Sequence, residues 1–135
     1  MMSIPAEPIA ITLDDGRRVS GLLRLPAGAR ACLVLAHGAG AGMQHSFLEA
    51  LASELADRSV ATLRYQFPYV ERGSRRPDPP RLCHATVRAA VEEAARLAPG
   101  AALFAGGKSF GGRMTSQAQA ASPLPGVQGI VLVSG

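Results

Sequence analysis

A serine flanked by glycines is the residue of this sequence that is best placed to do chemistry. Residues 107–111 (GKSFG) fit the pattern G-x-S-x-G and stand between an apolar run, Ala101–Ala105, and a helical pattern over Phe110–Ala121. So tight a turn from strand to helix leaves no room for side chains beside the serine, which explains the two glycines. The pattern predicts Ser109 as a nucleophile for acyl transfer, exposed at the positive end of the helix. A serine that only caps the helix is the alternative, but a cap needs no glycine on either side.

A second glycine-rich segment, residues 37–42 (HGAGAG), follows another apolar run, Ala31–Ala36. It resembles the HGGG-type loop of esterases and lipases. Negative charge that develops on a tetrahedral intermediate must meet backbone N–H groups, so such a loop needs residues with little or no side chain. We expect one N–H from Ala39 or Gly40 and a second from Phe110, the residue after the serine.

Two nucleotide-binding patterns come close to these segments and fail. A P-loop that ends at residues 107–109 (GKS) needs a glycine at position 102, where this chain has Ala102 within an apolar run. A dinucleotide fingerprint that begins at Gly38 needs its third glycine at Met43, and an acidic residue near the end of the next strand, which is Tyr65. We therefore expect no nucleotide and no other cofactor.

Strands and helices alternate along the chain, which predicts an α/β fold. Two β-prone runs, Pro8–Leu13 and Val19–Leu25, flank an Asp-Gly pair and predict a hairpin. Further strands are expected at Ala31–Ala36, Val60–Tyr65, Ala101–Ala105 and Val127–Val133, helices around residues 47–55, 82–97 and 110–121, and a loop at Gln66–Arg81. This order predicts a mainly parallel sheet with helices on both faces, with the chemistry in loops beyond the carboxyl ends of the strands.

Composition bounds the class of protein. The chain has 135 residues, enough for one domain, and is 47% hydrophobic and 18% charged, as in globular domains. Its net charge of +4 comes from scattered arginines, and aromatic residues make up only 4%, so we expect no nucleic-acid partner. No apolar run is long enough to cross a membrane and no secretory signal precedes the domain, which predicts a cytoplasmic protein. Cys32 and Cys83 lack the spacing of a metal site, so no metal is expected.

Three motifs in order carry a resemblance to a known family. HGAGAGM, FPYVERGSRRPDPP and GGKSFGGRM resemble the small α/β-hydrolase-like family typified by the testis-expressed hydrolase-like protein and the related subunit of a histone-acetyltransferase complex. The chain is also similar, more distantly, to dienelactone hydrolases. The resemblance covers nearly all of residues 8–135. It implies the α/β-hydrolase fold, with Ser109 at the nucleophile elbow and residues 37–42 at the oxyanion position.

The resemblance also suggests residues that contact the substrate. The segment 67–78 matches a family loop near the mouth of the active site, where an arginine would meet an anionic substrate; a solvated Pro/Arg loop is the alternative. His37 is expected to brace the end of its strand rather than to act as a base, and His45 opens the helix after the oxyanion loop. The candidate substrate-binding residues are His37, His45, Tyr69, Arg75 and Arg76.

One departure from the family pattern sets the expected extent of the domain. A hydrolase of this fold continues after the serine with an acid and then a histidine, and no Asp, Glu or His follows Ser109. His45 has no evident carboxylate to orient it and is not expected to replace the base. We therefore expect residues 1–135 to form one incomplete domain, the N-terminal two-thirds of a hydrolase, truncated after about six strands.

Two classes of function remain open from the sequence. The first is a serine hydrolase that acts on an ester, thioester or related acyl bond of a small molecule. As given, the chain would then be inactive or weakly active for lack of the acid and base. The second is a non-catalytic α/β-hydrolase-like module that binds a partner. The last strand, Gly129–Val133, is expected to be an exposed apolar edge, which favours dimerisation.

Overall fold

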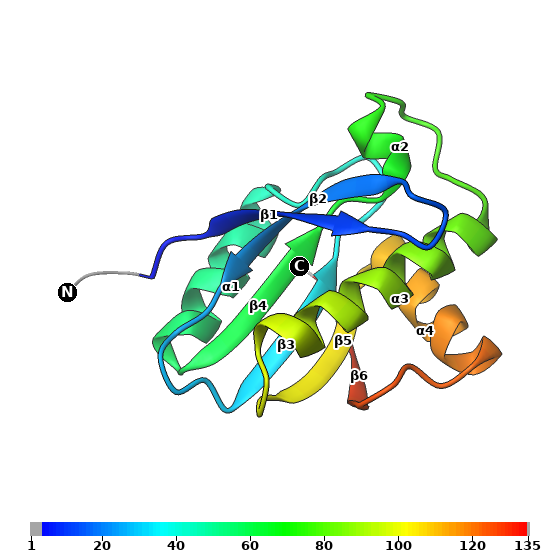
Figure 1. The fold of residues 1–135 in the computed structure, drawn as a ribbon. Helices are drawn as coiled ribbons and strands as arrows, with labels where there is room; N and C mark the ends of the chain where they lie inside the picture. The colour runs from blue at the N-terminus through cyan, green and yellow to red at the C-terminus, as the bar shows by residue number, and fades with distance from the viewer. Residues whose placement is uncertain (1–3, 135) are drawn as a thin grey trace.

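The computed structural model describes residues 4–134, which are built around a sheet of six strands in the order β1-β2-β4-β3-β5-β6 (Figure 1). The strands are β1 (Glu7–Thr12), β2 (Arg18–Arg24), β3 (Ala31–Ala36), β4 (Val60–Tyr65), β5 (Ala102–Lys108) and β6 (Val127–Val133). The helices are α1 (Ser46–Asp57), α2 (Pro68–Glu71), α3 (Pro80–Leu97) and α4 (Phe110–Ala121). The α/β class is thereby confirmed.

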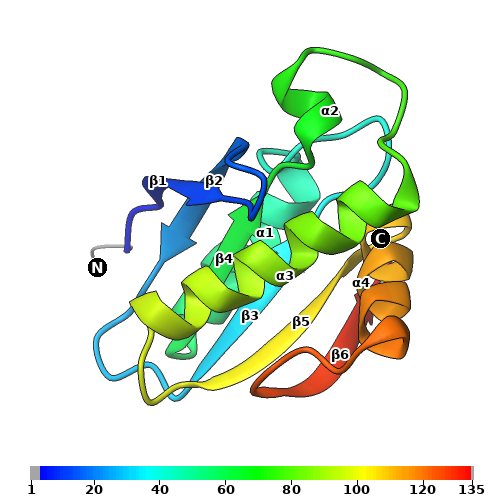
Figure 2. The same cartoon turned by 45° about the vertical axis from the view of Figure 1, so that its right-hand side comes forward.

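The pairing of the strands also agrees with the expectation. β1 and β2 form an antiparallel hairpin whose turn contains Gly16 at a φ of 89°. β2 runs antiparallel to β4, whereas β4, β3, β5 and β6 are mutually parallel. The crossovers between the parallel strands place α1 on one face of the sheet and α3 and α4 on the other (Figure 2). The sheet is therefore mainly parallel and covered on both faces.

The central strand β3 is apolar throughout because both of its faces are buried. Cys32, Val34 and Ala36 belong to the larger core, which α3 and α4 cover. Leu33 and Leu35 point to the opposite face and form a second core with residues of α1. A strand with cores on both sides cannot alternate between polar and apolar residues.

The structure differs from the sequence expectation mainly in the segment 66–81. Part of this segment is helical rather than a loop, because α2 forms one turn at Pro68–Glu71 and α3 begins at Pro80 instead of Leu82. Both helices begin at a proline, which fits the first helical position because its missing N–H would have no partner there. Strand β5 also continues past Ala105 to Lys108. Strand geometry therefore reaches the residue next to the serine.

The three loops predicted to carry chemistry lie at one edge of the sheet. In the parallel ladders Ala36 pairs with Tyr65 on one side and with Gly107 on the other. The segments that follow these three residues therefore start side by side, beyond the carboxyl ends of β3, β4 and β5 (Figure 1).

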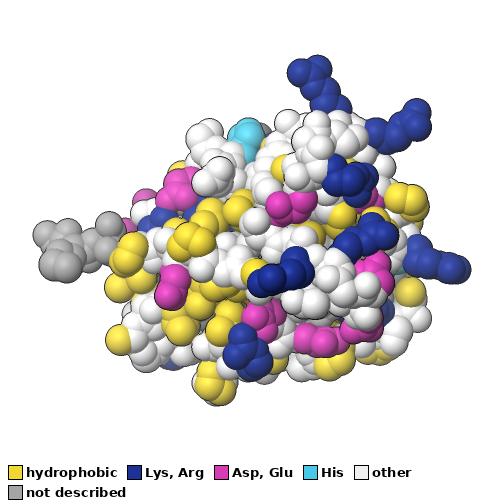
Figure 3. Space-filling model, turned by 45° about the horizontal axis from the view of Figure 1, so that its top comes forward, with side chains coloured by type: hydrophobic (Ala, Val, Ile, Leu, Met, Phe, Trp, Pro, Cys, Tyr) yellow, Lys and Arg dark blue, Asp and Glu magenta, His cyan; other side chains and the backbone are white. Residues whose placement is uncertain are grey.

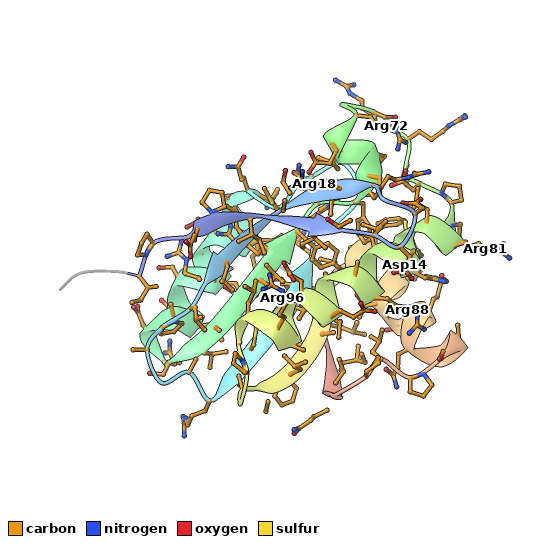
Figure 4. All side chains as sticks on the ribbon, in the orientation of Figure 1. Asp14, Arg18, Arg72, Arg81, Arg88 and Arg96 are labelled. Atoms are coloured by element: carbon orange, nitrogen blue, oxygen red, sulfur yellow. The ribbon has the colours of Figure 1, made fainter. Side chains whose placement is uncertain are left out.

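The surface mixes charges of both signs. In Figure 3 basic side chains are interspersed with acidic and apolar ones on the face shown. Arg81, Arg88 and Arg96 come from α3, and Arg72 comes from the end of α2 (Figure 4). Among the helices of residues 4–134, none has the length and apolar character needed to cross a bilayer.

Candidate active site

Ser109 occupies the turn between β5 and α4 in an unusual backbone conformation. Its φ is 51° and its ψ is −112°, a region that residues with a Cβ atom rarely enter. The residue is exposed, and its side chain makes no capping hydrogen bond to α4. The alternative of a serine that only caps the helix therefore lacks its defining contact. The turn instead holds the hydroxyl outside the helix, at the edge of the sheet.

The two glycines that flank Ser109 are required by close approaches of the backbone. A Cβ atom on Gly107 would lie 2.5 Å from the carbonyl oxygen of Ala36, and one on Gly111 would lie 2.5 Å from that of His37. Contacts this short are not found for real Cβ atoms, so the turn packs directly on the end of β3. The sequence predicted that side chains would not fit at positions 107 and 111. The structure shows why, because both positions lie against the end of β3.

The loop after β3 forms a tight turn with free amides. Ala41 N–H donates to the carbonyl of Gly38 at 3.2 Å, and Gly40 has a φ of 77°, as position i+2 of a type II turn requires. Among residues 4–134, the amides of Ala39 and Gly40 donate to no backbone carbonyl. Phe110 is the first residue of α4, where N–H groups have no partner within the helix. The amides of Ala39 and Phe110 thus have no backbone partner, and the Gly40 amide faces the Tyr69 hydroxyl.

A pocket of about 250 Å³ brings these segments together. Its walls are the Gly38–Ala41 turn, His45, Leu48, Lys108 and Ser109. Ser109, Ala39, Gly40 and His45 were expected from the sequence, and they meet here. Leu48 and Lys108 were not expected as site residues. For Lys108 a signal was available, because it stands between the end of a strand and the predicted nucleophile.

His37 lies behind the pocket rather than in it, which corrects its expected contact with substrate. The side chain is completely buried. Its Nε2 accepts the N–H of Phe67 at 3.1 Å, and its Nδ1 lies 2.8 Å from the Gly38 carbonyl, so the proton is assigned to Nδ1. Burial lowers the pKa of His37, although the Gly38 carbonyl and Asp78 oppose this. A neutral His37 thus braces the end of β3 against the chain that leaves β4.

Tyr69 also supports the loop from behind, so its expected contact with substrate is corrected as well. Its ring is buried and lies 6.0 Å from the ring of His37 and 6.4 Å from that of Phe110, measured between centroids. Among residues 4–134 the buried hydroxyl has no partner at full hydrogen-bond geometry, but the Gly40 amide faces it. Burial raises the pKa of Tyr69, and this amide opposes the rise. Tyr69 therefore packs beneath the Gly38–Ala41 turn.

Arg75 and Arg76 do not line the pocket, contrary to the expectation. Both are exposed on the segment between α2 and α3. This segment is held by Asp78, whose carboxylate accepts the Tyr69 N–H at 2.8 Å and pairs with Arg72 at 3.0 Å. The alternative of a solvated Pro/Arg loop describes the position of the two arginines.

His45 reaches the pocket but is committed to the start of α1. Its Nδ1 accepts the N–H of Phe47 at 3.2 Å, which caps the helix. In the neutral ring the proton is then on Nε2, so that nitrogen is a donor. Among residues 4–134, no imidazole or carboxylate makes a hydrogen bond to the Ser109 hydroxyl. The described residues thus hold a serine and amides, without a base in contact with the serine.

Comparison with known proteins agrees with this architecture. The family model described as "Alpha/beta hydrolase domain" matches residues 29–134. No curated protein matches the sequence. A dienelactone hydrolase from Anabaena variabilis is similar in structure with a TM-score of 0.83 and 21% identity, over 96% of this chain and 63% of that one.

Two other solved structures give the same result at similar identity. A cold-adapted esterase from an Arctic intertidal metagenomic library has a TM-score of 0.72 and 19% identity, over 98% of this chain and 61% of that one. An α/β serine hydrolase without a lid, from Xanthomonas campestris, has a TM-score of 0.72 and 19% identity, over 99% of this chain and 62% of that one. The chain thus spans less than two thirds of the length of each of these proteins. Since the strand order, the strained serine turn and the family match over residues 29–134 coincide, the chain belongs to the α/β-hydrolase family.

Proposed function

We propose that this chain carries the nucleophile and the oxyanion-stabilising part of a serine hydrolase that cleaves an ester, thioester or related acyl bond of a small molecule. The observation that carries the proposal is the conformation of Ser109. An exposed serine at positive φ, forced by two glycines that admit no side chain, opens into a pocket beside a turn with free amides. Strained backbone of this kind persists where surrounding structure imposes it, which is typical of active sites.

In the proposed reaction the Ser109 hydroxyl oxygen attacks the carbonyl carbon of the substrate. The carbonyl oxygen gains negative charge and accepts hydrogen bonds from the N–H of Phe110 and from that of Ala39 or Gly40. The serine proton passes to a general base, which returns it to the leaving oxygen or sulfur as the intermediate collapses. The alcohol or thiol then departs and an acyl-serine remains. Water then releases the acid and restores the serine.

We propose that the general base is none of the three histidines that the structure describes, His37, His45 and His84. His37 is buried with both ring nitrogens engaged, and His84 on α3 pairs with Gln117 at 3.0 Å. His45 has its acceptor nitrogen turned to α1. Oxyanion stabilisation alone leaves residual catalysis of about 10³–10⁴ over the reaction in water, so we expect the chain by itself to react slowly but measurably.

A fluorophosphonate probe tests the proposal. The 135-residue chain is expected to form a covalent adduct on the peptide that contains Ser109, located by mass spectrometry, and Ser109→Ala is expected to form none. Ser122→Ala is the control, because this exposed serine ends α4 away from the pocket and its loss is expected to leave labelling unchanged. A folded chain that stays unlabelled, or an adduct on another serine, would contradict the assignment and favour the non-catalytic binding module.

We also propose that β6 pairs with a second copy of the chain. β6 ends the sheet of the described residues, and Leu132 on it is 67% exposed, the most exposed large apolar side chain there. Sheet edges of this kind pair with other strands unless charged or covered.

Sedimentation velocity over a concentration series tests this pairing. The unmodified chain is expected to dimerise as concentration rises, and Leu132→Lys to stay monomeric. The matched control is Leu25→Lys, which changes the other exposed leucine, 40% exposed and at the opposite side of the sheet, and should still dimerise. A monomer at every concentration would refute the proposal.

A further inference from the structure

The pocket beside Ser109 offers hydrogen-bond donors and positive charge but no carboxylate. Its polar lining residues are Ser109, His45 and Lys108, beside the backbone of the Gly38–Ala41 turn. No Asp or Glu is among the residues that line it. A small cavity that combines donors and a cation without a negative charge favours ligands with negatively charged acceptors.

Lys108 is the basic residue among those that line the pocket. It is the last residue of β5 and directly precedes Ser109, so the rigid strand fixes where its side chain begins. Its ammonium nitrogen lies 5.7 Å from the centre of the Phe47 ring, an arrangement in which the aromatic face attracts the cation. Among residues 4–134 the ammonium forms no salt bridge. The cation is therefore positioned but not neutralised.

His45 adds a donor whose direction is set by α1. Because Nδ1 accepts the Phe47 N–H, the proton of the neutral ring is on Nε2, and His45 also lines the pocket. In this tautomer, which keeps the helix cap, an anion in the pocket would accept a hydrogen bond from Nε2. His45 and Lys108 thus both favour a negatively charged ligand.

The surrounding elements add to this positive potential. α1 and α4 both begin at the pocket, next to His45 and Ser109, and helix N-termini favour negative charge. The acidic residue in the first turn of α1, Glu49, forms ion pairs with two buried arginines, Arg24 and Arg64. The negative charge of Glu49 is therefore balanced by these two arginines. No acidic residue is present in the first turn of α4.

We propose that Lys108, assisted by His45, selects substrates that carry a carboxylate a few bonds from the scissile acyl bond. The selection of substrates rests on the proposed function, in which Ser109 attacks the carbonyl next to the bound carboxylate. Binding of the anion itself does not depend on it. Lys108 is then a specificity-determining residue that holds the anion, while the amides of Ala39 and Gly40, which donate to no backbone carbonyl, are left for the oxyanion. A volume of about 250 Å³ fits a short acyl group.

Binding at Lys108 can be followed by NMR without any turnover of substrate. The chain contains a single lysine, so a lysine side-chain signal needs no assignment. In the chain labelled with ¹³C-lysine, the one lysine side-chain signal in the NMR spectrum belongs to Lys108. Monomethyl succinate, which has a carboxylate and an ester, is expected to shift this signal and the amide signals of Ala39, Gly40 and Ser109 in a saturable way. Dimethyl succinate, the neutral counterpart of nearly the same shape, is expected to bind at least about tenfold more weakly, the loss expected for one charge-assisted hydrogen bond.

Substitution locates the charge. Lys108→Met is expected to weaken binding of monomethyl succinate at least about tenfold, followed through the same amide signals. The matched control is Arg113→Met, which removes an exposed cation on the first turns of α4 that lies over the Phe110 ring and outside the pocket. Because Arg113 is exposed and does not line the pocket, screening of its charge by salt predicts a change below about threefold.

The outcomes separate this inference from the proposed function. Equal affinity for the two succinates, unchanged affinity in Lys108→Met, or shifts confined to other parts of the chain would overturn it. If Lys108→Met does not fold, the Lys108 signal of the unmodified chain decides alone. Lysine-dependent binding without fluorophosphonate labelling of Ser109 would keep the anion site and reject the hydrolase. Labelling of Ser109 without anion binding would keep the proposed hydrolase and reject the anion site.

Discussion

Gly111→Ala is expected to destabilise the protein by about 3 kcal/mol or more and to remove the labelling of Ser109. The new Cβ atom would lie 2.5 Å from the His37 carbonyl oxygen and 2.7 Å from the Ala36 Cβ atom. Ala36 is the last residue of β3 and His37 follows it directly, so both neighbours lie where β3, buried between two cores, is braced by the His37 ring. Since neither side can yield cheaply, α4 must move away from the sheet and take the serine turn with it.

Urea unfolding followed by circular dichroism measures the loss of stability, and the fluorophosphonate reaction measures the loss of the site. Gly38→Ala is the control, because its Cβ atom would meet its nearest neighbour, the Lys108 carbonyl oxygen, at 3.5 Å, an ordinary contact. We expect this variant to unfold within about 1 kcal/mol of the unmodified chain. Equal free energies of unfolding for Gly111→Ala and Gly38→Ala would show that α4 does not approach the end of β3 closely enough to exclude a Cβ atom.

The parts of this fold that were predictable from the sequence are those in which a local pattern has a single steric solution. The glycines around Ser109 have one use, a sharp turn with close backbone contacts, and that turn is present. The apolar run 31–36 predicted a strand buried on both faces, and its bounds agree with β3. Strand order in the sheet depends on long-range pairing, and the single sequence predicted only its class.

The parts that were not predictable depend on which way a side chain points after the chain has folded. His37 and Tyr69 carry polar groups that resemble site residues in the sequence, yet both rings face the core behind the loop. Lys108 was passed over because its neighbours suggested only a failed P-loop, whereas β5 continues far enough to bring it to the pocket. A sequence shows that a residue is near a site, but packing decides on which side of the backbone it lies.

The buried arginines are the clearest feature that the sequence did not reveal. Arg64 on β4 is completely buried, and the side chain of Arg24 on β2 is 9% exposed. Both pair with Glu49 of α1, and Arg64 also donates to the Met43 carbonyl at 3.0 Å. Two Arg64 nitrogens, Nε and Nη2, have no partner among residues 4–134. One carboxylate thus serves two guanidinium groups beneath the helix.

Glu49→Ala is expected to lower the free energy of unfolding by about 2–3 kcal/mol. Removal of one partner from a buried ion pair costs about 3–5 kcal/mol because the remaining charge is buried without compensation. The value expected here is smaller because the Glu49 side chain is 48% exposed, so water reaches the pair. Glu49→Gln, which keeps the side-chain oxygen but not the charge, is expected to recover only part of the loss.

The same helix provides the matched control for this prediction. Glu54→Ala removes the partner of Arg58, in a pair whose side chains are both 67% exposed, and should cost no more than about 0.5 kcal/mol. Both variants replace a glutamate by alanine within α1, so differences in helix propensity cancel. Beyond the about 0.3–1 kcal/mol that Glu49 gains from the start of the helix, the difference between the two variants in urea unfolding reports the buried arginines. Equal losses would mean that water or another group already compensates Arg24 and Arg64, and that Glu49 is an ordinary surface residue.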